Sequence, residues 1–320
     1  MFKKKLKVIS LLLAFILFNP IVKSQDFPYK PVRIIVPFAP GGVSDILGRV
    51  LAEKLTLLWK QPVIIENRSG AGGSLGADMV LKSTADGHTL LISDASVATT
   101  NPMLYPSAPK DFSCVISLAR FGQILVSPAK SHINSIHDLL KTDKSKLALL
   151  NVASSGNGTS NHLVLEKFKA SAKINMTHVP YKGAGQAIAD LAGGQVDLMF
   201  TSAPLAQPLI SIGKLKALAV TASNRMIGFE QIPTLNEAGL EGFEWISAQG
   251  LFAPTGTPAF ILKKINSDIS KIIMSSEMRE KWIKMGLEFS ENSPEQFSAW
   301  IHDETVAIKA LILSGNIKLD

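Results

Sequence analysis

A glycine-rich turn near the start of the chain has the residue types that bind anions. Residues 40–45 read Pro40-Gly41-Gly42-Val43-Ser44-Asp45 and follow an aliphatic run at 32–36. Apolar residues then recur at helical spacing, so we expect a strand, a turn and a helix that begins near Ser44, its N-cap. Free N–H groups at such a helix start attract carboxylate or phosphate without any cationic side chain. The same turn could also be an ordinary strand-to-helix connection.

A second loop of the same kind follows a later aliphatic run. Residues 154–159 combine glycines with hydroxyl and amide side chains, and a helix is expected to begin near Ser160. Two such loops in different domains would face each other across a cleft. The residues expected to bind the ligand are Pro40, Gly41, Gly42, Val43, Asp45, Ser154, Ser155, Gly156, Asn157, Gly158, Thr159, His162 and Ser202.

Two of these side chains have alternative roles. Asp45 could complement the dipole of its helix, or accept a hydrogen bond from a ligand hydroxyl or ammonium group. His162 could donate to an anion from the first helical turn, or it could be an imidazole that packs in the core or lies at the surface. We expect Ala203, Pro204 and residues 245–249 to shape the rest of the cleft.

The motifs of common catalytic and cofactor sites are missing. The sequence has no Cys-x-x-Cys or His-x-x-x-His pair, no Gly-x-Ser-x-Gly elbow and no phosphate-binding Walker motif. The glycines of residues 70–76 miss the dinucleotide spacing. Because the histidines are scattered without partners at recognisable spacing, we expect no catalytic residues, no metal, no cofactor and no enzymatic activity.

The N-terminus predicts export. Lysines at positions 3–7 precede an apolar run at 8–18, and Val22-Lys23-Ser24 completes a secretory signal peptide, residues 1–24, with cleavage after Ser24. Loss of its five lysines lowers the formal net charge from +7 to +2, so the charge does not indicate a nucleic-acid partner. The single Cys114 cannot form an internal disulfide. We therefore expect an exported protein whose core alone stabilises it.

Strands alternate with helices along the mature chain, which predicts α/β domains with doubly wound, mainly parallel sheets. The sequence indicates two domains, with crossings near 121–126 and 247–252. Domain I is expected to comprise 25–123 and 250–320, domain II comprises 124–249, and the ligand cleft lies between them. The expected strands are 32–36, 62–67, 89–93, 147–152, 176–179, 196–200, 217–220 and 248–254, and a capping box at 293–296 starts a last helix.

The chain resembles the Bug family, the periplasmic substrate-binding proteins of tripartite tricarboxylate transporters. The resemblance rests on residues 28–42 with Asp45 and Arg49, then 61–68, 70–73, 155–159 with His162, 178–183, 213–221 and 253–258. It implies a two-domain periplasmic-binding-protein fold of the type II, Venus-flytrap kind. It also implies that backbone amides and ordered waters of the two loops hold a ligand carboxylate.

The expected function is therefore a monomeric extracytoplasmic receptor for a small organic anion. Its partners would be the carboxylate ligand and the membrane subunits of a tripartite tricarboxylate transporter. Alternatively, the receptor would present its ligand to a membrane signalling protein such as a sensor kinase. An exported enzyme acting on a carboxylate is the remaining alternative, since fold alone does not exclude one.

Overall fold

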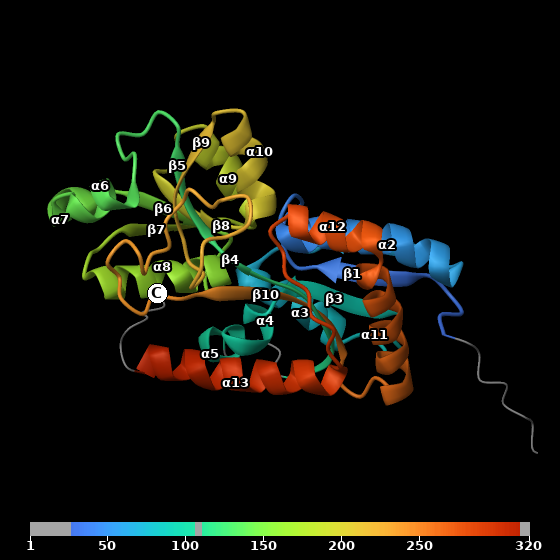
Figure 1. Ribbon diagram of the computed structural model, residues 1–320. Coiled ribbons are helices and arrows are strands. Elements are labelled where there is room, and N and C mark those ends of the chain that lie inside the picture. The colour runs from blue at the N-terminus through green and yellow to red at the C-terminus, as the bar shows by residue number, and fades with distance from the viewer. Residues whose placement is uncertain (1–26, 106–110, 314–320) are drawn as a thin grey trace, which may run out of the picture.

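The computed structural model describes residues 27–105 and 111–313, which form two α/β domains side by side (Figure 1). The expected signal peptide, residues 1–24, lies outside the described residues. Each domain is built on one five-stranded sheet. No helix in the described part of the chain is long and apolar enough to cross a membrane.

The first sheet has the strand order β2-β1-β3-β10-β4. Strands β2, β1 and β3 run parallel, whereas β10 runs antiparallel to both β3 and β4. β1 has the aliphatic sequence VRIIV, and most of its residues are buried, as the pattern of a central strand requires. The strands are β1 (Val32–Val36), β2 (Val63–Asn67), β3 (Thr89–Asp94), β4 (Phe112–Gly122) and β10 (Ile246–Pro254).

The second sheet repeats this plan with the order β7-β6-β8-β5-β9. Here β6 runs parallel to β7 and β8, and β5 runs antiparallel to β8 and β9. Both sheets are therefore mixed and partly parallel, and the predicted fold class is confirmed. The strands are β5 (Ile124–Pro128), β6 (Asn151–Ser154), β7 (Thr177–Pro180), β8 (Leu198–Thr201) and β9 (Leu215–Val220).

One predicted strand, at 147–152, lies too early in the chain. Residues Lys144–Leu147 form a short helix instead, because the Asp143 carboxylate accepts the Ser145 N–H at 2.8 Å and caps it. The strand begins only at Asn151, whose N–H donates to Asp197 Oδ2. Aliphatic composition alone does not separate these two outcomes.

Two strands carry the chain between the sheets. β5 begins two residues after β4 ends, and β10 pairs with β4 from Ile246 onward. The crossings near 121–126 and 247–252 stay a prediction. Residues 246–249 already pair with β4 in the first sheet, and the expected boundary at 250 lies inside β10.

Helices cover both faces of each sheet. In the first half of the chain these are α2 (Val43–Trp59), α3 (Ser74–Leu81), α4 (Ser96–Thr99), α5 (Asn101–Leu104) and a 3-10 turn at Ala71–Gly73. The second domain has α6 (Ile136–Lys141), α7 (Lys144–Leu147), α8 (Ser160–Ala172), α9 (Ala184–Ala192) and α10 (Ala203–Ser211). The chain returns to the first domain through α11 (Ala259–Met274), α12 (Ser276–Lys284) and α13 (Pro294–Leu313).

The last helix contacts both domains. Its predicted capping box is present: Gln296 N–H donates to Ser293 Oγ, and Ser293 N–H donates to Gln296 Oε1. Phe297, near its start, packs in the first domain against Phe252. Ile308, near its end, is buried in the core cluster of the second domain. Helix α13 thus runs beneath both domains (Figure 1).

Candidate functional site

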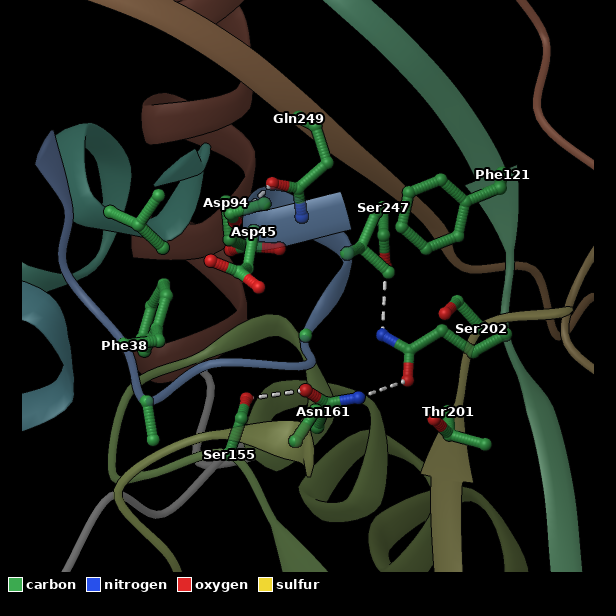
Figure 2. Close-up of a pocket in the computed structure, with 17 residues that line it drawn as sticks. Phe38, Asp45, Asp94, Phe121, Ser155, Asn161, Thr201, Ser202, Ser247 and Gln249 are labelled. Carbon is green, nitrogen blue, oxygen red and sulfur yellow. Dashed lines mark hydrogen bonds between the residues drawn. The ribbon is translucent and has the colours of Figure 1, made fainter. Parts of the chain in front are cut away.

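A small cavity lies where the two domains meet. It offers about 50 Å³ to the centres of water-sized spheres, which is room for a few water molecules. Residues of both sheets and of both crossings enclose it (Figure 2). The lining residues are Val36, Phe38, Ala39, Gly42, Val43, Ser44, Asp45, Asp94, Phe121, Gln123, Ser155, Asn161, Ala184, Thr201, Ser202, Ser247 and Gln249.

The N-terminus of α2 faces this cavity. Its N-cap is Gly42, in an extended conformation (φ −83°, ψ 171°), and no side chain caps the helix. The prediction that Ser44 is the N-cap is wrong, because its Oγ donates to Gln249 Oε1 at 2.6 Å instead. Within the described residues, the N–H groups of Gly42, Val43 and Ser44 have no protein acceptor. The cavity therefore receives several unpaired donors and the positive end of the helix dipole.

Other helix starts point to the same place. Asn161, Ala184 and Ser202 line the cavity, and they lie at the beginnings of α8, α9 and α10 respectively. None of the described lining residues is Lys, Arg or His. Oriented backbone N–H groups at these helix starts suit an anion without a guanidinium clamp.

Two buried hydroxyl groups of the second domain add to these donors. Thr201 and Ser202 are 1% and 4% exposed, and neither hydroxyl has a hydrogen-bond partner among the described residues. The Nε2 group of Gln249 also turns toward the cavity, because its Oε1 is held by Ser44 (Figure 2). A buried polar group without a partner is costly, so these atoms are suited to a ligand that pairs with them.

A polar network at the crossings fixes one wall of the cavity. Gln123 donates to Ser247 Oγ at 2.7 Å, and its Oε1 accepts from Asn161 at 3.0 Å. Ser155 in turn donates to Asn161 Oδ1 at 2.5 Å (Figure 2). Of these four residues, Ser155 was expected to bind the ligand and Ser247 was expected to shape the cleft, whereas Gln123 and Asn161 were not expected in the site. The position of Asn161 could have indicated its role, since it is a polar residue in the first turn of the predicted helix, directly before His162.

The loop at 154–159 uses most of its donors internally. Gly156 N–H donates to Ser154 Oγ and Gly158 N–H donates to His162 Nδ1, both at 3.1 Å. The Thr159 hydroxyl donates to the Gly156 carbonyl at 2.7 Å. Only Ser155 of this loop lines the cavity. The loop therefore serves as a rigid support more than as a row of free N–H groups.

His162 differs from the expected anion donor. Its ring is 2% exposed and stacks on His178, with ring centroids 3.9 Å apart. Its Nδ1 accepts a hydrogen bond, so the neutral tautomer with a proton on Nε2 fits the site. Burial, together with the charges of His178 and Lys169, lowers the pKa of His162 to about 3. The neutral ring stabilises the loop by accepting the hydrogen bond from Gly158 N–H, and it does not line the cavity.

Asp45 lines the cavity, but its oxygens are already bonded. Arg49 donates to both carboxylate oxygens at 2.9 and 3.0 Å, and Gly41 N–H and Asn67 Nδ2 complete the set. Burial alone would raise the pKa of Asp45, yet these hydrogen bonds lower it overall. The carboxylate therefore fastens the turn at 40–42 to its own helix.

The structure brings part of the expected set to the cavity: Gly42, Val43, Asp45, Ser155 and Ser202. The other expected residues lie outside its lining. These are Pro40, Gly41, Ser154, Gly156, Asn157, Gly158, Thr159 and His162. Several of them instead close the gap between the domains.

Backbone contacts at glycines form this seam between the domains. Ala39 N–H donates to the Lys182 carbonyl at 3.0 Å. A Cβ on Gly185 would lie 2.5 Å from the Pro40 carbonyl oxygen, and one on Gly72 would collide with the Asn157 carbonyl. Only glycine lets the two backbones approach this closely.

Comparisons with known proteins identify the family. The chain matches the family described as "Tripartite tricarboxylate transporter family receptor" over residues 47–317. It is 34% identical to Protein BugT of Bordetella pertussis over 305 residues, which cover 93% of each chain. The chain belongs to this receptor family. Its members are non-enzymatic solute receptors, so the expectation that the protein is not an enzyme is confirmed.

Solved structures agree with this assignment. R. palustris Rpa4515 with adipate has a TM-score of 0.87 and 31% identity, covering 91% of this chain and 99% of that one. MatC from Rhodopseudomonas palustris with bound malate has a TM-score of 0.84 and 31% identity, covering 89% and 100%. The receptor therefore has the two-domain fold of periplasmic binding proteins.

We expect Gly185→Ala to keep the domains apart without unfolding the receptor. Alanine favours the α9 helix over glycine by about 1 kcal/mol, but its Cβ meets the Pro40 carbonyl. Small-angle X-ray scattering should give a larger radius of gyration than wild type. Gly193→Ala at the end of the same helix, with no contact under 3.5 Å, is the control. A variant with wild-type dimensions would contradict the role of the seam.

We expect His162 to make stability depend on pH. The unfolded residue titrates near 6.5 and the folded one near 3, so the unfolded state binds more protons between these values. The free energy of unfolding should fall as the pH decreases through this window, by up to about 1.4 kcal/mol per pH unit. Urea unfolding from pH 7 to pH 4 measures this dependence.

A non-titrating variant isolates this contribution of His162. His162→Asn keeps an oxygen acceptor for Gly158 N–H and should flatten the dependence. His137→Asn, at an exposed position, should leave it unchanged. Equal pH dependence in wild type and His162→Asn would refute this assignment.

Proposed function

We propose that the receptor binds a small organic anion through one carboxylate at the N-terminus of α2. The observation that carries this proposal is the set of N–H groups of Gly42, Val43 and Ser44, which have no acceptor in the described chain and face a cavity. Thr201, Ser202 and Gln249 Nε2 supply further donors around the same space. The complexes of two relatives, one with adipate and one with malate, support a carboxylate as the ligand class.

The proposed site has direct and supporting parts. Gly42, Val43, Ser155 and Ser202 would contact the ligand, together with Thr201 and Gln249. Asp45, His162 and the remaining residues of the two loops would hold those contacts in place. The proposed domains are 25–123 with 250–320, and 124–249. The strand bounds favour moving the second boundary to about 246.

The proposed setting is the periplasm. A signal peptide cleaved after Ser24 would export the chain, and the mature receptor would act as a monomer. It would deliver its ligand to the membrane subunits of a tripartite tricarboxylate transporter, in agreement with its family. Presentation of the ligand to a sensor kinase is the alternative output of the same binding event.

A thermal-shift screen tests the ligand class. Mature protein, residues 25–320, is mixed with monocarboxylates, dicarboxylates, tricarboxylates, amino acids and neutral sugars. A ligand at 100 times its Kd stabilises the folded state by about 2.7 kcal/mol, which raises the melting temperature measurably. Stabilisation by carboxylates supports the proposal. Stabilisation by neutral sugars alone would overturn it.

We expect Gly42→Val to abolish binding while leaving the fold intact. Gly42 has a φ of −83°, which valine tolerates, and a Cβ there has no neighbour within 4 Å because it enters the cavity. Calorimetry with the best carboxylate of the screen should show at least about a hundredfold loss of affinity, or about 2.7 kcal/mol. Gly193→Val, outside the cavity with φ −79°, is the matched control. Unchanged affinity in Gly42→Val would remove α2 from the site.

A further inference from the structure

Asp94 is an acidic side chain in the cavity that no role described so far explains. It is the last residue of β3, and it is the Cα partner of Gln249 across the sheet. Its Oδ1 accepts the Ser96 N–H at 2.9 Å. Figure 2 places it beside Gln249, close to the start of α2.

Asp94 and Asp45 differ in how their charges are balanced. Asp45 forms an ion pair with Arg49, whereas Asp94 has no cationic partner among the described residues. The carboxylate of Glu304 adds no favourable charge, because it and the Asp94 carboxylate repel each other. Burial raises the pKa of Asp94 although its hydrogen bonds oppose this shift. A carboxylate in such a place is stabilised by a partner that brings positive charge.

The Asp94 carboxylate is an acceptor that lines the same cavity as the proposed anion site at the start of α2. The α2 N–H groups and the Gln249 Nε2 group donate into the cavity, and Asp94 is the Cα partner of Gln249 on the adjacent strand. A ligand that fits both halves carries a carboxylate for the donors and a cationic donor for Asp94. A second ligand carboxylate near Asp94 would instead meet a like charge with no Lys, Arg or His lining the cavity to offset it.

We propose that Asp94 is a specificity-determining residue that selects a ligand with an ammonium group beside its carboxylate, a small zwitterionic amino acid. The inference rests on the proposed function, because it assumes a carboxylate at the start of α2. The small cavity agrees with a compact ligand. Specificity here arises from repulsion of the wrong ligand as much as from attraction of the right one.

Matched pairs of acids that differ by one amino group test this proposal. Calorimetry at pH 7.5 compares L-alanine with propionate, L-aspartate with succinate, and L-glutamate with glutarate on the mature protein. Wild type should bind the amino member of at least one pair about tenfold or more tightly than its partner. Equal or tighter binding of the members without an amino group in every pair that binds would overturn the role of Asp94.

Asp94→Asn is the diagnostic variant. It keeps an oxygen for the Ser96 N–H but removes the charge, so the preference for the amino member should fall about tenfold or more. Asp303→Asn is the control, because it removes an exposed acid of α13 that does not line the cavity, and it should leave the preference unchanged. A preference that survives in Asp94→Asn would overturn the proposal, and far-ultraviolet circular dichroism verifies the fold of both variants.

The outcomes separate this inference from the proposed function. If no acid of any pair binds and no carboxylate of the thermal-shift screen stabilises the receptor, the carboxylate site at α2 is itself refuted, and the inference with it. If acids bind but the amino group makes no difference, only the role of Asp94 is refuted. If Asp94→Asn does not fold, the comparison of pairs on wild type still decides the preference.

Discussion

The unpaired N–H groups at the start of α2 are the constraint on which the site depends. Two nearby side chains could have capped them, but each is engaged elsewhere, and the N-cap residue itself is a glycine. Ser44 donates to Gln249, Asp45 is held by Arg49 and Asn67, and Gly42 has no side chain. Since a helix end without a cap costs about 1 kcal/mol per lost capping bond, the sequence leaves donors that a ligand can satisfy. The site can bind an anion because the side chains that could cap α2 form hydrogen bonds with other residues.

The two domains contribute to the site in different ways. The first domain supplies the start of α2, whose N–H donors are free. In the loop at 154–159 of the second domain, N–H groups donate instead to Ser154 and His162. A neutral imidazole is necessary for this, because Nδ1 must accept and not donate. The buried hydroxyls of Thr201 and Ser202 then supply what the loop does not. One wall is electrostatic and the other is a rigid hydrogen-bonding surface.

Local patterns in the sequence were enough for the strand, turn and helix at 32–59, because aliphatic runs and glycines act within a few residues. They also indicated most of the other strands and the capping box at 293–296, but they did not give β4 or β5. They were not enough for the network of Gln123, Asn161 and Ser247, whose members lie 38 and 124 residues from Gln123 along the chain. The orientation of His162 also depends on a distant segment, since His162 in α8 stacks on His178 in β7. Side-chain roles set by distant segments have no local signature.

The contacts between the domains differ in strength, and this ranking determines which of them a domain movement would break first. The glycine seam has close backbone contacts and the hydrogen bond from Ala39 to Lys182, worth about 0.5–1.5 kcal/mol net. Helix α13 buries Ile308 in the second domain and Phe297 in the first, and each such side chain contributes about 1.5–3 kcal/mol. The seam is therefore the weaker connection, whereas α13 and the two crossings hold the domains together. Separation at the seam exposes the start of α2 while the core of each domain stays intact, which is what entry of a solute requires.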